Sequence, residues 1–263
     1  MRAYIALFMM SAREAFAQKG SIIGTACVHL FHIVALLGIY SVAFNARGGS
    51  LAGMDMTSTL WSIMAYFVVL ALSVRLVAKE MAREIRLGSY ETKLNKPFNY
   101  LICSWATQLG KGMPFFILVG GFNIAFLFLI LGPPALSFSL SWMAGVLALF
   151  VGGICLGLLF YGIIGLCAVW LQDVDPLYWV MDKGVMLLGG AYIPVALFPA
   201  SIRAIGEHTP FGAIMFISHI FNPDFSAKWG ELFLTQVIWM LIFSIVALFV
   251  YKNAMKHVSV NGG

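Results

Sequence analysis

Between Lys111 and Asp173 the chain carries no charged residue at all. An ordinary soluble domain would place charged side chains along such a stretch, because about 25% of its residues are charged. In this chain only 10% of the residues are charged and 61% are hydrophobic. Lipid must therefore be the solvent for much of the exterior, and the sequence predicts a protein embedded in a membrane.

The charge-free stretch is too long for a single transmembrane helix, since about 20 residues rising 1.5 Å each cross the hydrocarbon core. Gly132-Pro133-Pro134 divides it into a helical hairpin, because proline cannot continue a helix. The predicted transmembrane segments are 22–44, 57–74, 112–131, 136–170, 184–202 and 232–251. We therefore predict an all-α polytopic membrane protein with six transmembrane helices, forming a single domain over residues 1–263.

The N-terminal segment, 1–19, has the pattern of an amphipathic helix with one apolar and one polar face. The apolar positions are Ile5, Phe8, Met9, Ala12 and Phe16. The polar positions are Ser11, Glu14 and Gln18. We expect this helix to lie in the membrane interface before the first transmembrane segment.

The basic residues indicate the orientation, because cytoplasmic loops are enriched in lysine and arginine. With a cytoplasmic N-terminus and a transmembrane segment at 184–202, the basic residues outside are only Arg47, Arg203 and Lys228. Without that segment, Lys252 and Lys256 would lie outside as well. The pattern therefore favours six segments with both termini cytoplasmic, in the inner or plasma membrane.

The segment 203–223 would then lie on the outer side as a re-entrant helical hairpin, within an extracytoplasmic region at 199–228. Its apolar pieces are short and are interrupted by glycine and proline. Non-helical backbone at membrane depth is tolerated only where protein buries it or where it lines a wet cavity. We therefore expect this region to face protein or a transport pathway rather than lipid.

The loop between the second and third segments, 77–97, concentrates charge. With the residue that precedes it, the loop contains six of the 16 basic residues: Arg75, Lys79, Arg83, Arg86, Lys93 and Lys96. Residues 79–86 are compatible with a helix, and Gly88 is suited to its end. Ser89 could cap a second short helix. Charge alone indicates a solvated cytoplasmic loop, and the alternative is a helix that docks a cytoplasmic partner.

Two blocks of sequence resemble permease subunits of the type-2 class of ATP-binding cassette (ABC) transporters, which are mostly bacterial exporters. The first block consists of Glu84-Ile85-Arg86, Gly88, Leu94 and Pro97. The second block consists of Gly189-Gly190, Pro194, Pro199, Pro210-Phe211 and Asn222-Pro223. The order of these motifs, the interfacial helix and the six predicted segments extend the resemblance over nearly the whole chain.

The resemblance implies a dimer of permease chains, identical or related, that carries two P-loop ATP-binding subunits in a lipid bilayer, with no nucleic acid. The residues coupled to the ATP-binding subunit would be Arg83, Glu84, Ile85, Arg86, Gly88, Leu94 and Pro97. The gate at the outer face would contain Gly189, Gly190, Pro194, Pro199, Pro210 and Phe211. No cofactor is expected on this chain, because ATP and Mg would bind to the partner.

No P-loop is recognisable in this sequence. At the pair Gly110-Lys111, Trp105 stands where the first glycine of the motif belongs, and Gly112 stands where serine or threonine belongs. The chain is therefore not expected to be an enzyme by itself. Because the transmembrane segments carry almost no charge, we expect an amphipathic or lipid-like substrate.

Two other functions stay open: a membrane anchor for a cytoplasmic ATPase without transport, and an intramembrane enzyme. Glu207-His208 would suit acid–base chemistry, but the sequence shows no HExxH or GxSxG motif to accompany it. His29 and His32, one turn apart, are explained most simply by polar packing, with a role in the transport pathway as the alternative and no metal site expected.

One inner loop holds three acidic residues, Asp173, Asp175 and Asp182. We interpret them as solvated loop charges. A cation site or a second contact for the ATP-binding subunit is the alternative.

Overall fold

The computed structural model describes residues 2–51, 53–90, 93, 99–134, 139–171 and 173–261. These residues form helices and one small antiparallel sheet, in which β1 (Ser50–Leu51) pairs with β2 (Met54–Asp55). Five helical segments among them are long and apolar enough to span a membrane: Lys19–Ala46, Met56–Arg86, Tyr100–Leu131, Leu140–Val169 and Phe225–Ala254. The chain is therefore an all-α, multi-pass membrane-embedded protein.

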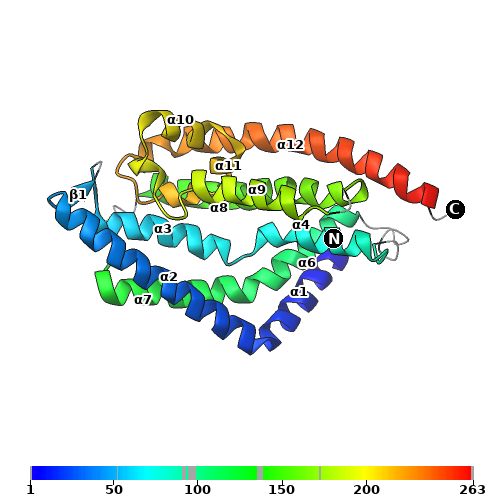
Figure 1. The fold of residues 1–263 in the computed structure, drawn as a ribbon, viewed down its shortest axis with the longest axis horizontal. Helices are drawn as coiled ribbons and strands as arrows, with labels where there is room; N and C mark the ends of the chain where they lie inside the picture. Colours follow the sequence, from blue (N-terminus) through cyan, green and yellow to red (C-terminus); the bar gives the residue numbers. More distant parts are fainter. Residues whose placement is uncertain are drawn as a thin grey trace.

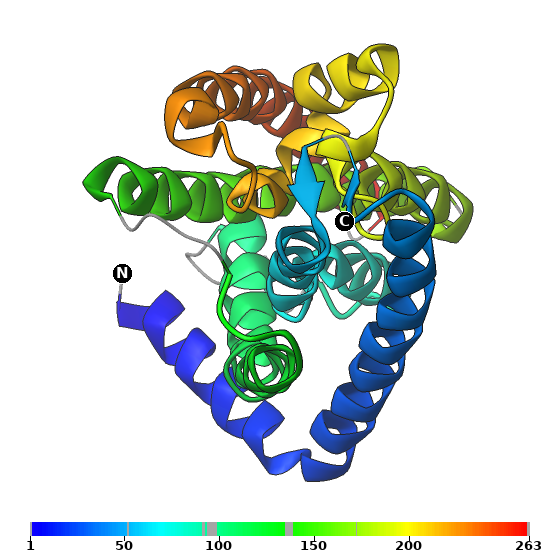
Figure 2. The same cartoon turned by 90° about the vertical axis from the view of Figure 1, so that its left-hand side faces the viewer.

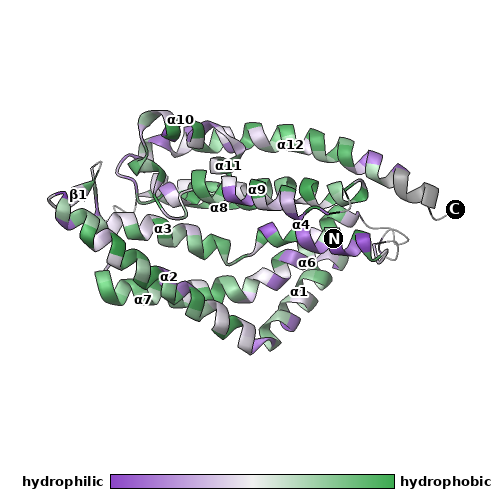
Figure 3. Cartoon of the chain, viewed as in Figure 1, coloured by the Kyte–Doolittle hydropathy of each residue, from purple (hydrophilic) through white to green (hydrophobic). Residues whose placement is uncertain are grey.

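The long helices run side by side along the long axis of the molecule (Figure 1). Their middles are hydrophobic, and hydrophilic residues gather toward the two ends (Figure 3). Viewed along this axis, α3 (Met56–Leu70) lies between α2 (Lys19–Ala46), α7 (Gly121–Leu131) and α8 (Leu140–Leu166) (Figure 2). Most side chains of α3 are buried, so this helix forms the centre of the core.

Helix α1 (Arg2–Ala17) packs against α6 (Tyr100–Phe115) through its small residues. Ser11, Ala12 and Ala15 are buried. The contact is close because Gly110 has no side chain: a Cβ atom there would lie 2.3 Å from the carbonyl oxygen of Phe8. The larger apolar residues of α1 face outward, and the exposed ones include Ile5, Met9, Met10 and Phe16.

Helical structure extends past two predicted transmembrane boundaries, both of which were placed at a charged residue. The second segment does not end before Arg75, because α3 is followed by a short break, a 3-10 turn at Val74–Leu76 and then α4 (Val77–Arg86). The third segment does not begin at Gly112, because α6 already begins at Tyr100. In each case the charged residue has an ion-pair partner on another helix.

The predicted segment 184–202 is not a continuous helix. Helix α9 (Asp175–Leu188) ends where Gly189 and Gly190 follow, the latter with φ +85°. The chain continues through short elements: Val195–Leu197, α10 (Ala200–His208), α11 (Pro210–Ala213) and Phe216–His219. Residues 212–220 are all buried, so this part of the irregular backbone faces protein, whereas α10 has exposed residues that include Ile202 and Ile205.

The two ends of the chain lie toward the same end of the molecule, opposite β1 (Figure 1). An odd number of crossings would leave the two chain ends at opposite ends of the molecule. The five long helical segments therefore cannot produce this arrangement alone. Helix α9 and the short elements after it carry the chain back, and α12 (Phe225–Asn261) then returns to the end where α4 lies.

Candidate functional site

The second transmembrane segment is broken between α3 and α4. Ser73 has φ +55°, a left-handed conformation that residues other than glycine seldom adopt. The side chain of Gln108 on α6 donates a hydrogen bond of 2.9 Å to the carbonyl oxygen of Ser73. A Cβ atom on Gly112 would lie only 1.9 Å from the carbonyl oxygen of Leu72. Helix α6 therefore lies directly against the break and satisfies a carbonyl group there.

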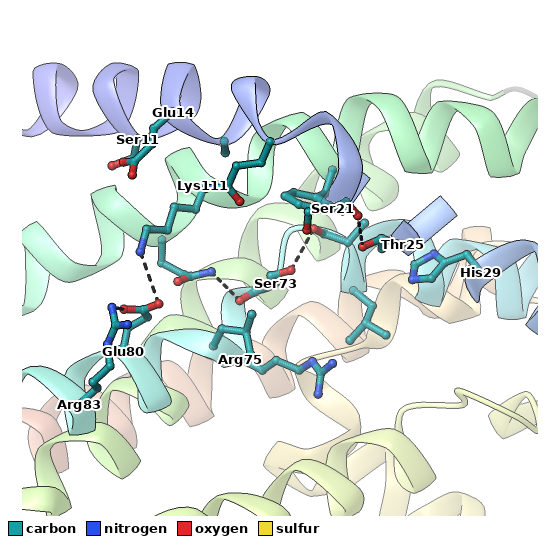
Figure 4. Close-up of a pocket in the computed structure, with 17 residues that line it drawn as sticks. Ser11, Glu14, Ser21, Thr25, His29, Ser73, Arg75, Glu80, Arg83 and Lys111 are labelled. Carbon is teal, nitrogen blue, oxygen red and sulfur yellow. Dashed lines mark hydrogen bonds and ion pairs between the residues drawn. The ribbon is translucent and has the colours of Figure 1, made fainter. Parts of the chain in front are cut away.

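A polar cavity of about 520 Å³ lies beside this break, between α1, α2, α6 and the α3–α4 junction (Figure 4). Its charged lining residues are Glu14, Arg75, Glu80, Arg83 and Lys111. Ligand pockets of proteins typically measure about 300–1,000 Å³. The break therefore lies where non-helical backbone is tolerated in a membrane protein, shielded by α6 and bordering a polar space.

Glu80 on α4 holds two cations on the wall of the cavity. Its carboxylate lies 2.7 Å from Nη2 of Arg83 and 3.4 Å from Nζ of Lys111. Figure 4 shows Lys111 reaching from α6 toward Glu80. Because Lys111 and Glu80 belong to different helices, this ion pair ties α4 to α6 next to the break.

Arg75 connects the break to α9. Its Nη1 lies 3.1 Å from Oδ2 of Asp182 and donates a 3.2 Å hydrogen bond to the hydroxyl of Tyr178. The hydroxyl of Tyr161 on α8 donates to the other oxygen of Asp182 at 3.0 Å. The Asp182 side chain is only 3% exposed, so Arg75 and Tyr161 compensate its charge in place of water.

The predicted coupling residues differ in what they face. Arg83 and Arg86 are exposed and Ile85 is half-buried. Glu84 is turned toward its own chain, where it accepts hydrogen bonds from Tyr100 (3.0 Å) and Lys93. The predicted residues Leu94 and Pro97 lie outside the described residues.

Gly88 ends α4, as the sequence predicts. It has φ +68°, and the backbone N–H groups of Leu87 and Gly88 bond to the carbonyl oxygens of Arg83 (3.0 Å) and Ile85 (3.1 Å). The left-handed conformation at this position favours glycine, because a Cβ atom would approach the following carbonyl oxygen.

Replacement Gly88→Ala is therefore expected to lower the free energy of unfolding by about 1 kcal/mol. Thermal unfolding of the purified protein in detergent measures the effect. Gly24→Ala is the control, because Gly24 lies inside α2 and a Cβ there would meet no atom within 4 Å. A Gly88→Ala protein that is as stable as the Gly24→Ala protein would contradict the assigned helix end.

The predicted gate residues lie in two groups that meet. Gly189 and Gly190 follow α9, Pro194 and Pro199 precede the next short helices, and Pro210 and Phe211 begin α11. Ser218, in the turn that follows α11, donates a 2.9 Å hydrogen bond to the carbonyl oxygen of Gly189, which joins the segment after Phe211 to the Gly189-Gly190 turn. None of these residues lines the polar cavity beside the break.

The two histidines of α2 have the polar packing that the sequence indicates. Nδ1 of His29 lies 3.0 Å from Nδ2 of Asn123, and Nδ1 of His32 lies 3.0 Å from the carbonyl oxygen of Val28. Both rings also pack against Phe67. His29 lines the polar cavity, whereas His32 does not.

Sequence reasoning missed the cavity itself. It interpreted Asp182 as a solvated loop charge, which is wrong, because this residue is 2% exposed and paired with Arg75. It also gave no role in the site to Glu14 or Gln108. One signal was present: Arg75 directly follows one predicted apolar segment and Asp182 lies just before another, on the same predicted side of the membrane.

No family model matches this chain, and no curated protein matches it either.

Proposed function

We propose that this chain is the membrane-spanning subunit of an ABC exporter, driven by ATP hydrolysis on a separate P-loop subunit. The observation that supports this function most directly is the continuity between α3 and α4. A charged, partly exposed helix continues a buried transmembrane helix through a break that borders a polar cavity. A partner that moves α4 would thereby change the shape of the cavity.

Helix α4 has the two faces that a coupling element needs. On one face Val77, Ala78, Met81 and Ala82 are fully buried, and they include the residues that pack closely against Gly165 of α8. On the other face Arg83 and Arg86 are exposed, and Leu87, just after the helix, is 73% exposed. A force on the exposed face would move α4 as a unit, and the chain would bend at the break.

The proposed topology has six transmembrane segments with both termini cytoplasmic, in the inner or plasma membrane, and a second permease chain completing the transporter. The position of the two chain ends toward one end of the molecule supports an even number of segments. The re-entrant region at 199–228 would contain the buried segment 212–220, and the glycine and proline residues around that segment would close the pathway at the outer face.

The proposed substrate is amphipathic or lipid-like. Besides the polar cavity, the chain has a wholly apolar recess of about 200 Å³ between α3, α8 and the π-helical turn Phe116–Gly120. Its lining includes Trp61, Val68, Phe116 and Phe150. An amphipathic molecule could place its polar part in one environment and its apolar part in the other.

The proposed function predicts a partner. Purification of the protein from its native membrane in mild detergent is expected to recover a P-loop ATPase in near-equal amount. Recovery of the chain alone would contradict the proposal and favour the intramembrane enzyme. Stimulation of ATP hydrolysis by cargo would distinguish transport from a mere membrane anchor.

The double variant Arg86→Glu/Leu87→Asp is expected to reduce recovery of the ATPase at least tenfold, because it places negative charge on the exposed face of α4. Thermal unfolding should stay unchanged, because both side chains are exposed. Arg47→Glu is the matched control, since Arg47 is exposed near β1, at the opposite end of the molecule. Full recovery of the ATPase with the double variant would exclude α4 as the docking element.

A further inference from the structure

We propose that the polar cavity beside the helix break binds the head group of an amphipathic zwitterion, a molecule with one anionic group, one protonated amine and an apolar chain. Only the identification of this ligand as the transported substrate rests on the proposed function. Binding itself follows from the charges and shape of the cavity.

The wall of the cavity formed by α4 and α6 carries an excess of positive charge. The charge of Arg75 is already taken by Asp182, which lies outside the cavity. Arg83 and Lys111 share the single carboxylate of Glu80. One positive charge therefore faces the cavity without a full counterion. An anionic group such as a phosphate would complete this cluster through charge-assisted hydrogen bonds.

The opposite wall of the cavity carries a carboxylate, that of Glu14. Glu14 projects from α1 into the cavity (Figure 4). It forms no ion pair with any part of the chain that the structure describes. A protonated amine on the ligand would supply its partner. The lining charges then balance, so a neutral ligand with separated charges fits better than a plain anion, which would leave Glu14 without a partner.

Apolar residues join the lining on α6 and α3, whereas α2 keeps the lining polar on its side through Ser21, Thr25 and His29. On α6, Lys111 is followed one turn later by Phe115 on the same face. On the neighbouring wall, Leu70 lies at the end of α3, on the far side of the break from Glu80. A head group held by Lys111 and Glu14 would therefore direct an attached apolar chain toward Phe115 and Leu70.

The test compares two lysolipids with the same acyl chain and the same phosphate. Lysophosphatidylethanolamine carries an amine and lysophosphatidylglycerol does not. Binding to the purified protein in detergent is measured by native mass spectrometry. The wild type is expected to bind the ethanolamine lipid at least tenfold more tightly, about 1.4 kcal/mol. Glu14→Gln should abolish this preference, and Lys111→Gln should weaken binding of both lipids.

Arg13→Gln is the matched control, because Arg13 is exposed on α1 next to Glu14 but does not line the cavity. Thermal unfolding checks that each variant is folded. If Lys111→Gln fails to fold, Glu14→Gln still tests the proposal, because Glu14 is exposed and its replacement should leave folding unchanged. Equal binding of the two lipids by the wild type, or a preference that persists in Glu14→Gln, would overturn the proposal.

Glycerophosphoethanolamine, which has the head group without the chain, is expected to bind at least tenfold more weakly. Equal affinity would keep a zwitterion site but contradict an amphipathic ligand. If no ATPase is recovered with the protein but the protein still prefers the ethanolamine lipid, the proposed transport function is contradicted. The proposed binding site is then supported independently of transport.

Discussion

Replacement of Gly112 by alanine is expected to lower the free energy of unfolding by about 3 kcal/mol. The added Cβ atom would lie 1.9 Å from the carbonyl oxygen of Leu72 and 2.6 Å from its carbonyl carbon. These are backbone atoms, which cannot rotate away as a flexible side chain can. Alanine favours a helix over glycine by about 1 kcal/mol, but this gain is smaller than the cost of moving α6 away from the break.

The matched control is Gly121→Ala in the same transmembrane segment, where a Cβ atom would meet nothing within 4 Å. This variant is expected to be as stable as the wild type, or more stable by about 1 kcal/mol. Thermal unfolding of both variants in the same detergent measures the difference. Similar stability of the two variants would mean that α6 does not lie against the break.

The second large effect is expected for Asp182→Asn, which should lower the free energy of unfolding by about 3–5 kcal/mol. The substitution leaves the Arg75 guanidinium without its counterion, while the Arg75 side chain is only 34% exposed. It also changes the group that accepts the hydrogen bond from Tyr161. Under the proposed function, ATP-dependent transport should fall as well, because the pair links the break to α9.

The control for this substitution is Asp175→Asn. Asp175 pairs with Lys79, which lies on α4 shortly after Arg75. The Asp175 side chain is 47% exposed, and the ion pair measures 3.6 Å. The expected loss is below about 1 kcal/mol, as for other exposed ion pairs. The double variant Arg75→Met/Asp182→Leu should recover most of the stability, since no buried charge then lacks a partner. Equal losses for Asp182→Asn and Asp175→Asn would show that Asp182 is not a buried counterion.

The prediction of membrane helices from the sequence was accurate where apolar length alone decides. The charge-free stretch after Lys111 forms two long helical segments separated at Gly132, which has φ +75°. The end of α4 at Gly88 was also predictable, because a left-handed helix end favours glycine. These features depend on local backbone conformation and on burial in lipid, and neither requires a distant partner.

The candidate site depends on contacts between distant residues. Lys111 and Arg75 were taken as ends of transmembrane segments, but Lys111 lies inside α6, and Arg75 lies in the short turn between α3 and α4. Their charges are tolerated because Glu80 and Asp182 approach them from other helices. A sequence pattern shows that a residue is charged, but it does not show whether a counterion will reach it.

The sequence by itself determined that the chain is helical, that lipid is its solvent, and where its hairpin turn and the end of α4 lie. Only the tertiary structure decided where the second transmembrane segment breaks. Residues 71–73 contain neither glycine nor proline, so no local signal marks the break. It exists because Gly112 lets α6 approach Leu72 closely and Gln108 satisfies the carbonyl group of Ser73. A polar cavity then forms beside the break, bordered by helices far apart in the sequence.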